Sequence, residues 1–155
     1  MAQIWGPSSG RPVPRLLASL LCEDAATSSG LADGRVTLQR VFFDLYADAF
    51  PAGFDRLTVV NFWAAGEASG RAAVPAHRVT VRIVAPDGAE VARGEAELAF
   101  PAGAVTVVQV VYFPGLVLPE PGRCTVEVSL DDAAVHTYTL HVTGLAEEEV
   151  GDESR

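Results

Sequence analysis

The side chains best suited to chemistry are two cysteines and three histidines, and their positions disfavour a catalytic or metal centre. Cys22 and Cys124 lie 102 positions apart in apolar stretches, so we expect two buried free thiols and no disulfide framework. His136 and His141 are five positions apart in one expected strand. Their side chains then point to opposite faces and cannot share a metal ion unless the strand bulges. His77 is followed by an arginine, whose charge disfavours a bound cation nearby.

Other catalytic patterns are missing from the sequence. It has no Gly-X-Ser-X-Gly turn for a nucleophilic serine, and its glycines do not follow a nucleotide-binding spacing. All basic residues are arginine, which excludes chemistry that needs a lysine amine. We therefore expect no enzyme, no cofactor and no catalytic, cofactor-binding or metal residues. A hydrolase whose triad is assembled in space stays a third alternative.

Acidic residues in the expected turns suggest one alternative with a ligand. If the strands follow one another up and down, Asp33, Glu67, Asp131 and Asp132 meet at one rim, and Asp87 lies at the opposite end. Calcium takes six to eight oxygen ligands, and loops of β-sandwich domains can supply them. Aspartate is also an ordinary turn residue, which explains the same positions without a metal.

Composition restricts the class of protein. About half of the residues are apolar, and 155 residues suit a single domain. The net charge of −9 disfavours nucleic acid as a partner. The apolar run 16–22 is too short to cross a bilayer and is poorly suited to a signal peptide, so we expect no membrane insertion. Together with the free cysteines, this predicts a cytoplasmic protein.

The stretch 119–142 shows most clearly how the chain folds. Apolar residues alternate with polar ones in 123–130 and again in 133–142, and Asp131 and Asp132 lie between the two runs. This pattern predicts a β-hairpin with one buried face. Similar runs elsewhere bring the expected number of strands to about eight: 16–22, 35–46, 57–64, 77–84, 90–100, 105–113, 123–130 and 133–142. We predict an all-β fold, an antiparallel two-sheet β-sandwich of the immunoglobulin-like or C2-like kind.

Three of these strands carry a more specific prediction. The run 16–22 is expected to be buried on both faces, and the valine-rich 105–113 to be a central strand. A bulge or a doubly buried end would explain the consecutive apolar residues after Val41. The domain is expected to span 16–143. It lies between a loose arm at 1–15, rich in Gly and Pro, and a disordered acidic tail at 144–155.

The chain also resembles an uncharacterised bacterial family of small β-sandwich proteins. The resemblance lies in Leu16–Asp24, the glycine turn at Gly34, Val36–Phe42 and Leu118–Val128, and it covers about 16–142. It implies the fold and a bacterial source. It carries no catalytic signature and so implies no activity.

We therefore predict a non-catalytic protein-interaction module or subunit of a bacterial complex. Its contact surface is expected at an exposed sheet edge or at the arm around Trp5. The partner is an unknown protein, and homo-oligomerisation stays open. The alternative is a calcium-dependent binding module that uses the rim with Asp33, Asp131 and Asp132.

Overall fold

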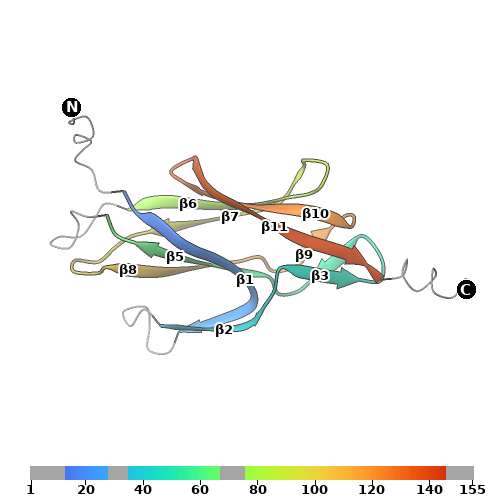
Figure 1. The fold of residues 1–155 in the computed structure, drawn as a ribbon, viewed down its shortest axis with the longest axis horizontal. Helices are drawn as coiled ribbons and strands as arrows, with labels where there is room; N and C mark the ends of the chain where they lie inside the picture. Colours follow the sequence, from blue (N-terminus) through green and yellow to red (C-terminus); the bar gives the residue numbers. More distant parts are fainter. Residues whose placement is uncertain (1–12, 28–34, 67–75, 146–155) are drawn as a thin grey trace, which may run out of the picture.

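Eleven strands form three sheets in the computed structural model, which describes residues 13–27, 35–66 and 76–145 (Figure 1). Sheet A has the order β2 (Val36–Val41), β1 (Arg15–Thr27), β5 (Thr58–Ala64) and β8 (Thr106–Tyr112). Sheet B has the order β3 (Asp44–Ala47), β11 (Ala133–Gly144), β10 (Gly122–Leu130), β6 (His77–Val84) and β7 (Glu90–Leu98). The short strands β4 (Ala52–Phe54) and β9 (Leu116–Leu118) pair with each other. The prediction of an all-β fold is confirmed.

Sheets A and B share one apolar core. Val59 and Trp63 of β5 pack in the same cluster as Val81 of β6 and Val126 of β10, and all four are fully buried. These residues lie at alternate positions of their strands, so each strand turns its apolar side toward the other sheet. Burying a side chain of this size contributes about 1.5–3 kcal/mol. The every-other-residue pattern in the sequence therefore builds the layer between the sheets.

The β10–β11 hairpin forms as the sequence predicts. Asp131 and Asp132 link the two strands, and both have positive φ (49° and 73°). Two-residue hairpin turns of this kind match the twist of the flanking strands. Val126 and Val128 are fully buried, while Glu127 lies on the outer face beside Arg82 of β6. A register shift between Val128 and Ser129 places one bulge near the turn.

The stretch 35–46 differs most from the prediction. It is two strands in two different sheets, because the chain leaves sheet A after β2 and joins sheet B at β3. The consecutive apolar residues mark this change of sheet and not a bulge within one strand. Arg40 has φ 58°, which ends the regular strand before the crossing. β3 runs parallel to β11, so the fold is not wholly antiparallel, and eleven strands replace the expected eight.

Two further predictions about individual strands were wrong. Leu17 of β1 is 50% exposed, so the start of this strand is buried on one face only. β8 is the last strand of sheet A and not a central one. β5 is buried on both faces, since the neighbours Val59 and Val60 are both fully buried. Val60 faces the outer side of sheet A, where Val36 and Leu38 of β2 pack against its cluster.

β1 is longer than β2 and β5, so it can pair with both of them. From Arg15 to Cys22 it pairs with β5, and from Cys22 to Thr27 it pairs with β2. The arm around Trp5, the residues 28–34 and 67–75, and the acidic tail beyond Leu145 lie outside the described residues. The described part of the chain contains no helix long and apolar enough to cross a membrane.

Candidate functional site

The two cysteines are buried, free thiols, as the sequence predicts. Cys22 of β1 packs with Val60 of β5 on the outer side of sheet A. Cys124 lies in the core between the sheets. Burial raises the pKa of both thiols, since it disfavours the thiolate. The thiolate is the nucleophile, so neither cysteine is activated for chemistry.

The histidines do not assemble a metal site with one another. The pairing of β11 with β10 is regular from His136 to His141, so their side chains lie on opposite faces. The ring of His136 lies 5.4 Å from that of Tyr138. Nowhere in the described residues do three or more His, Cys, Asp or Glu side chains gather into a group that could hold a metal ion.

The carboxylates of the β10–β11 turn bond to the start of β6. His77 Nδ1 lies 2.6 Å from Asp131 Oδ2, and the backbone N–H of Arg78 donates to Asp131 Oδ1 at 2.9 Å. The Arg78 guanidinium lies 3.1 Å from Asp132 Oδ2. The hydrogen bond from His77, followed by the one from the Arg78 backbone, lowers the pKa of Asp131. These carboxylates hold the turn against β6.

Of the other acidic positions in the prediction, the structure describes only Asp87. Asp33 and Glu67 lie outside the described residues. Asp87 accepts a hydrogen bond from the backbone N–H of Ala89 at 2.9 Å, which is ordinary turn chemistry.

A row of hydrogen-bonded polar side chains crosses the core, and the sequence reading missed it. We call it the buried polar chain; it comprises Ser19, Asn61, Trp63, Gln109 and Tyr138. Ser19 Oγ donates to Asn61 Oδ1 at 2.7 Å, and Asn61 Nδ2 donates to Gln109 Oε1 at 3.3 Å. Gln109 Oε1 also accepts from Trp63 Nε1 at 3.1 Å. The sequence signal for this chain was a polar residue at a position where the alternation places side chains in the core. Asn61, between Val59 and Trp63 at alternate positions, is such a residue.

The bond between Ser19 and Tyr138 joins this chain to sheet B. The two hydroxyl oxygens lie 2.9 Å apart. Because Ser19 gives its only proton to Asn61, Tyr138 must donate to Ser19. Burial raises the pKa of Tyr138 to about 12, which keeps this donor protonated. Gln109 Nε2 donates to the backbone oxygen of Glu97 at 3.4 Å, so each polar side-chain atom of the buried polar chain has a hydrogen-bond partner.

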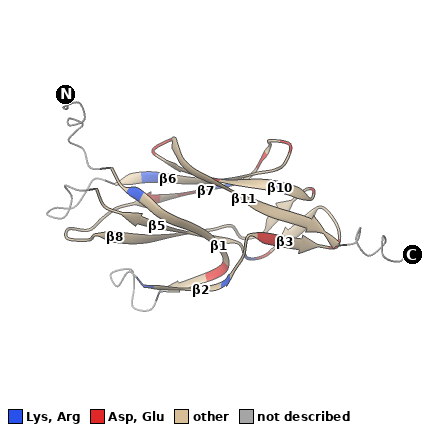
Figure 2. Ribbon diagram, viewed as in Figure 1, with Lys and Arg blue, Asp and Glu red and all other residues tan. Residues whose placement is uncertain are grey.

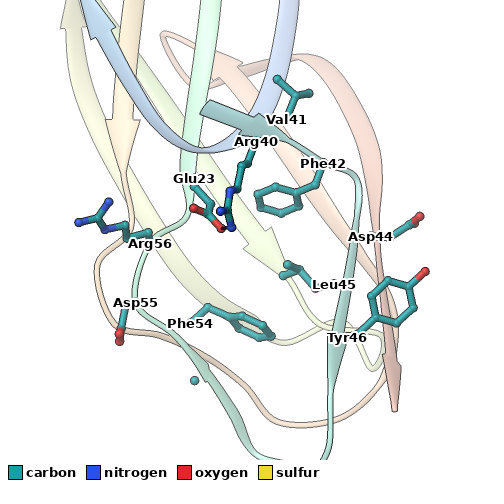
Figure 3. Close-up of a pocket in the computed structure, with 11 residues that line it drawn as sticks. Glu23, Arg40, Val41, Phe42, Asp44, Leu45, Tyr46, Phe54, Asp55 and Arg56 are labelled. Atoms are coloured by element: carbon teal, nitrogen blue, oxygen red, sulfur yellow. Dashed lines mark hydrogen bonds and ion pairs between the residues drawn. The ribbon is translucent and has the colours of Figure 1, made fainter. Parts of the chain in front are cut away.

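An open surface groove lies where the chain changes sheets. Its volume is about 610 Å³, and its apolar wall is formed by Phe42, Leu45 and Phe54, which pack on the core from one side. In Figure 3 these three side chains surround the hollow, and Arg40 lies beside Glu23, to one side of the Phe42 ring. The Arg40 guanidinium is 3.5 Å from the Glu23 carboxylate. The groove thus combines an apolar wall with a charged rim.

Exposed apolar side chains lie along the same segment. In the crossover segment (residues 41–46), Val41 is 47% exposed, Phe43 38% and Tyr46 56%. The side chains of Phe42 and Leu45 turn to the core, so this short segment is apolar on both sides. The ring of Phe43 rests edge-on against Tyr138 at 5.9 Å, which fixes its position. Clustered exposed apolar groups commonly mark a contact surface.

The protein is therefore all-β. Sheets A and B share one apolar core, and a groove with an apolar wall lies where the chain passes from one sheet to the other. The chain belongs to the family DUF6941, a family of unknown function, whose model matches residues 17–143. No curated protein matches the chain.

Proposed function

We propose that this protein is a non-catalytic protein-interaction module, an adaptor or subunit of a bacterial complex. Its contact surface is the groove together with the crossover segment. The observation that carries this proposal is the exposure of Val41, Phe43 and Tyr46 beside a hollow with an apolar wall. Large exposed apolar side chains in one short segment are costly to leave in water, and a partner that covers them removes that cost.

The partner segment that fits is extended and carries one large apolar side chain. Among the described residues β3 pairs only with β11, which leaves its second edge open to a further strand. β3 contributes Asp44, Leu45 and Tyr46 to the groove. An extended segment can hydrogen-bond to that edge while its apolar side chain enters the groove. The ion pair of Arg40 and Glu23 is solvent-exposed and offers polar groups to the backbone of such a segment.

We also propose a specific fold class and a cellular compartment for this protein. The core shared by sheets A and B supports a β-sandwich, of the immunoglobulin-like or C2-like kind. Two buried free thiols are consistent with a cytoplasmic protein.

Two matched valines test the contact surface. Val41 is 47% exposed in the crossover segment, and Val135 is 45% exposed on β11 away from the groove. We expect that wild type and Val135→Glu capture the same partner from the native cells after cross-linking, and that Val41→Glu loses it. Capture of that partner by Val41→Glu at the wild-type level would contradict the proposal.

The calcium-binding alternative has its own test. The carboxylates of Asp131 and Asp132 already bond to His77 and Arg78, so the described residues lend it no support. Under our proposal, the melting temperature is the same in calcium and in chelator. A ligand that binds only the folded state raises that temperature, so a clear rise in calcium would favour the alternative.

A further inference from the structure

Along the whole length of β8, no strand in the described part of the chain pairs with the outer edge of sheet A. β8 is the last strand in its sheet and pairs only with β5, from Thr106 opposite Ala64 to Tyr112 opposite Thr58. The register of this pair has no shift, so β8 is regular over seven residues. Within the described ranges, no backbone group bonds to its other side.

The backbone groups on this open edge can be identified. The N–H of Phe113 donates to Leu57 O at 2.8 Å, and the N–H of Ala65 donates to Val105 O at 2.9 Å. Hydrogen-bonded pairs alternate along an antiparallel ladder, so the odd-numbered residues of β8 bond to β5. The even-numbered residues, Thr106 to Tyr112, therefore present their N–H and C=O groups to the open edge.

The other terminal strands carry features that disfavour a long ladder with a second copy; the open edge of β3 has room only for a short segment. β7 has charged side chains at Glu90, Arg93, Glu95 and Glu97. β3 has only four residues, and β2 ends next to Arg40 with its positive φ. Charges, short length and irregular backbone are the usual protections of a sheet edge. β8 has none of them: it contains four valines and no charged residue, proline or glycine (Figure 2).

We propose that two copies of this chain dimerise through antiparallel pairing of their β8 strands. With Gln109 on the two-fold axis, Val108 of each copy lies opposite Val110 of the other, and Thr106 lies opposite Tyr112. This register joins even-numbered residues to even-numbered residues, so every outward N–H and C=O meets a partner. The two sheets A then form one continuous sheet across the dimer.

The uncharged, self-complementary sequence of β8 is the reason that the occupant is a second copy: in the proposed register valine meets valine and no charge meets a charge. Each copy carries a net charge of −9, and like charges directly opposite each other in a ladder are destabilising. β8 is the edge where two copies can meet without opposing a charge to a charge. The pairing uses the same strand in both copies, so it closes after two chains and does not grow into a fibre. An interface of two strand edges is small, so we expect a weak, micromolar dimer.

The test is sedimentation over a range of protein concentrations, with Val110→Pro as the main variant. Proline at this position removes an N–H that points to the open edge and leaves the bonds to β5 in place. We expect that wild type passes from monomer to dimer as concentration rises, and that dimerisation of Val110→Pro is at least tenfold weaker. Tyr112→Lys, which places a charge at the edge, should weaken it similarly.

A matched tyrosine separates this inference from the groove. Tyr46 is 56% exposed and Tyr112 is 57% exposed, but Tyr46 lies in the crossover segment. We expect Tyr46→Lys to dimerise like wild type. As a second measurement, exchange of the Val108 and Val110 amides should slow by at least tenfold from dilute to concentrated protein. A wild type that stays monomeric at every concentration, or unchanged dimerisation in Val110→Pro and Tyr112→Lys, would overturn the proposal.

Discussion

Two networks of polar side chains, one buried and one exposed, show how solvent decides the value of a hydrogen bond. The buried polar chain runs from Tyr138 through Ser19 and Asn61 to Gln109, between the two sheets. On the outer face of sheet B, Arg82 pairs with Glu90 at 2.7 Å and with Glu127, and Arg93 also pairs with Glu90; we call these four residues the surface ion cluster. The surface cluster has charges and short distances, whereas the buried chain has only neutral groups.

The difference lies in what replaces each bond when it is broken. Water can solvate any member of the surface ion cluster, and dissolved salt screens its charges. Asn61 is fully buried and Gln109 is 7% exposed, so a lost bond there leaves an unpaired group in the core. Such a group keeps its full desolvation cost, about 1–3 kcal/mol. We therefore expect stability to depend on the neutral chain more than on the charged cluster.

The largest effect is expected from Asn61→Ala. This change opens a cavity and leaves the Ser19 hydroxyl without its acceptor, and Gln109 loses one of its two donors. The free energy of unfolding should fall by about 3 kcal/mol, measured by urea denaturation. Thr125→Ala, on the exposed face of β10, is the control and should lower it by no more than about 1 kcal/mol, the range of strand propensities. A loss below about 1 kcal/mol in Asn61→Ala would contradict the expectation that stability depends mainly on the buried polar chain.

A smaller effect is expected from Tyr138→Phe, and it depends on pH. At neutral pH the variant loses the hydrogen bond to Ser19, which should cost about 1 kcal/mol. The pKa of Tyr138 is raised to about 12 in the folded protein, above its ordinary value of 10.0. The folded state thus holds this proton more tightly than the unfolded state, so its contribution is complete below pH 10 and is lost as pH rises to about 12.

The pH profile of the variant makes this prediction sharper. Denaturation curves between pH 9 and 12 should show that wild type loses about 2–3 kcal/mol more than Tyr138→Phe. Parallel decline of the two proteins would mean that Tyr138 is not held in its protonated form by the fold.

A still smaller effect is expected from Glu90→Gln in the surface ion cluster. Its hydrogen bonds from Arg93 and Arg82 lower the pKa of Glu90, but the group is solvent-exposed. We expect a slight fall in melting temperature at low salt, and none at high salt because the ions screen the pair. A fall as large as that of Asn61→Ala would reverse the comparison.

The smallest effect is expected at the exposed turn, from Asp131→Asn. Asparagine tolerates the positive φ of this position, so the change removes the charge and keeps the turn. Because the pKa of Asp131 is lowered in the folded protein, its contribution is present at neutral pH and disappears as pH falls through that lowered pKa. The small excess stability of wild type over the variant should therefore vanish in acid, as thermal melts can measure.

The sequence predicts the strands whose environment is simple. In β10, apolar residues alternate with polar ones, and the structure buries Cys124, Val126, Val128 and Leu130. The acidic pair between β10 and β11 likewise predicts the turn, because aspartate accepts a positive φ. Apolar residues alternate with polar ones where only one face of a strand meets the core, as in β10.

The sequence does not predict which strands are neighbours. Val41–Phe43 read as one continued strand, yet the chain changes sheets there. The valines of β8 indicate burial, but the outer side of Val108 is covered by residues such as Leu38 of β2 and not by two flanking strands. The groove and the buried polar chain depend on these neighbours, since Asn61 and Gln109 come from different strands. Neither feature can be found from spacing along the chain.

The parallel pairing of β3 with β11 has a consequence for synthesis. His141 pairs with Asp44, so β3 obtains its partner from a strand that leaves the ribosome about 100 residues later. Until then the crossover segment has no docking place in sheet B, and its aromatic side chains stay open to the nascent chain's surroundings. The region that we propose as a contact surface therefore contains the strand that waits longest for its partner among the described strand pairs.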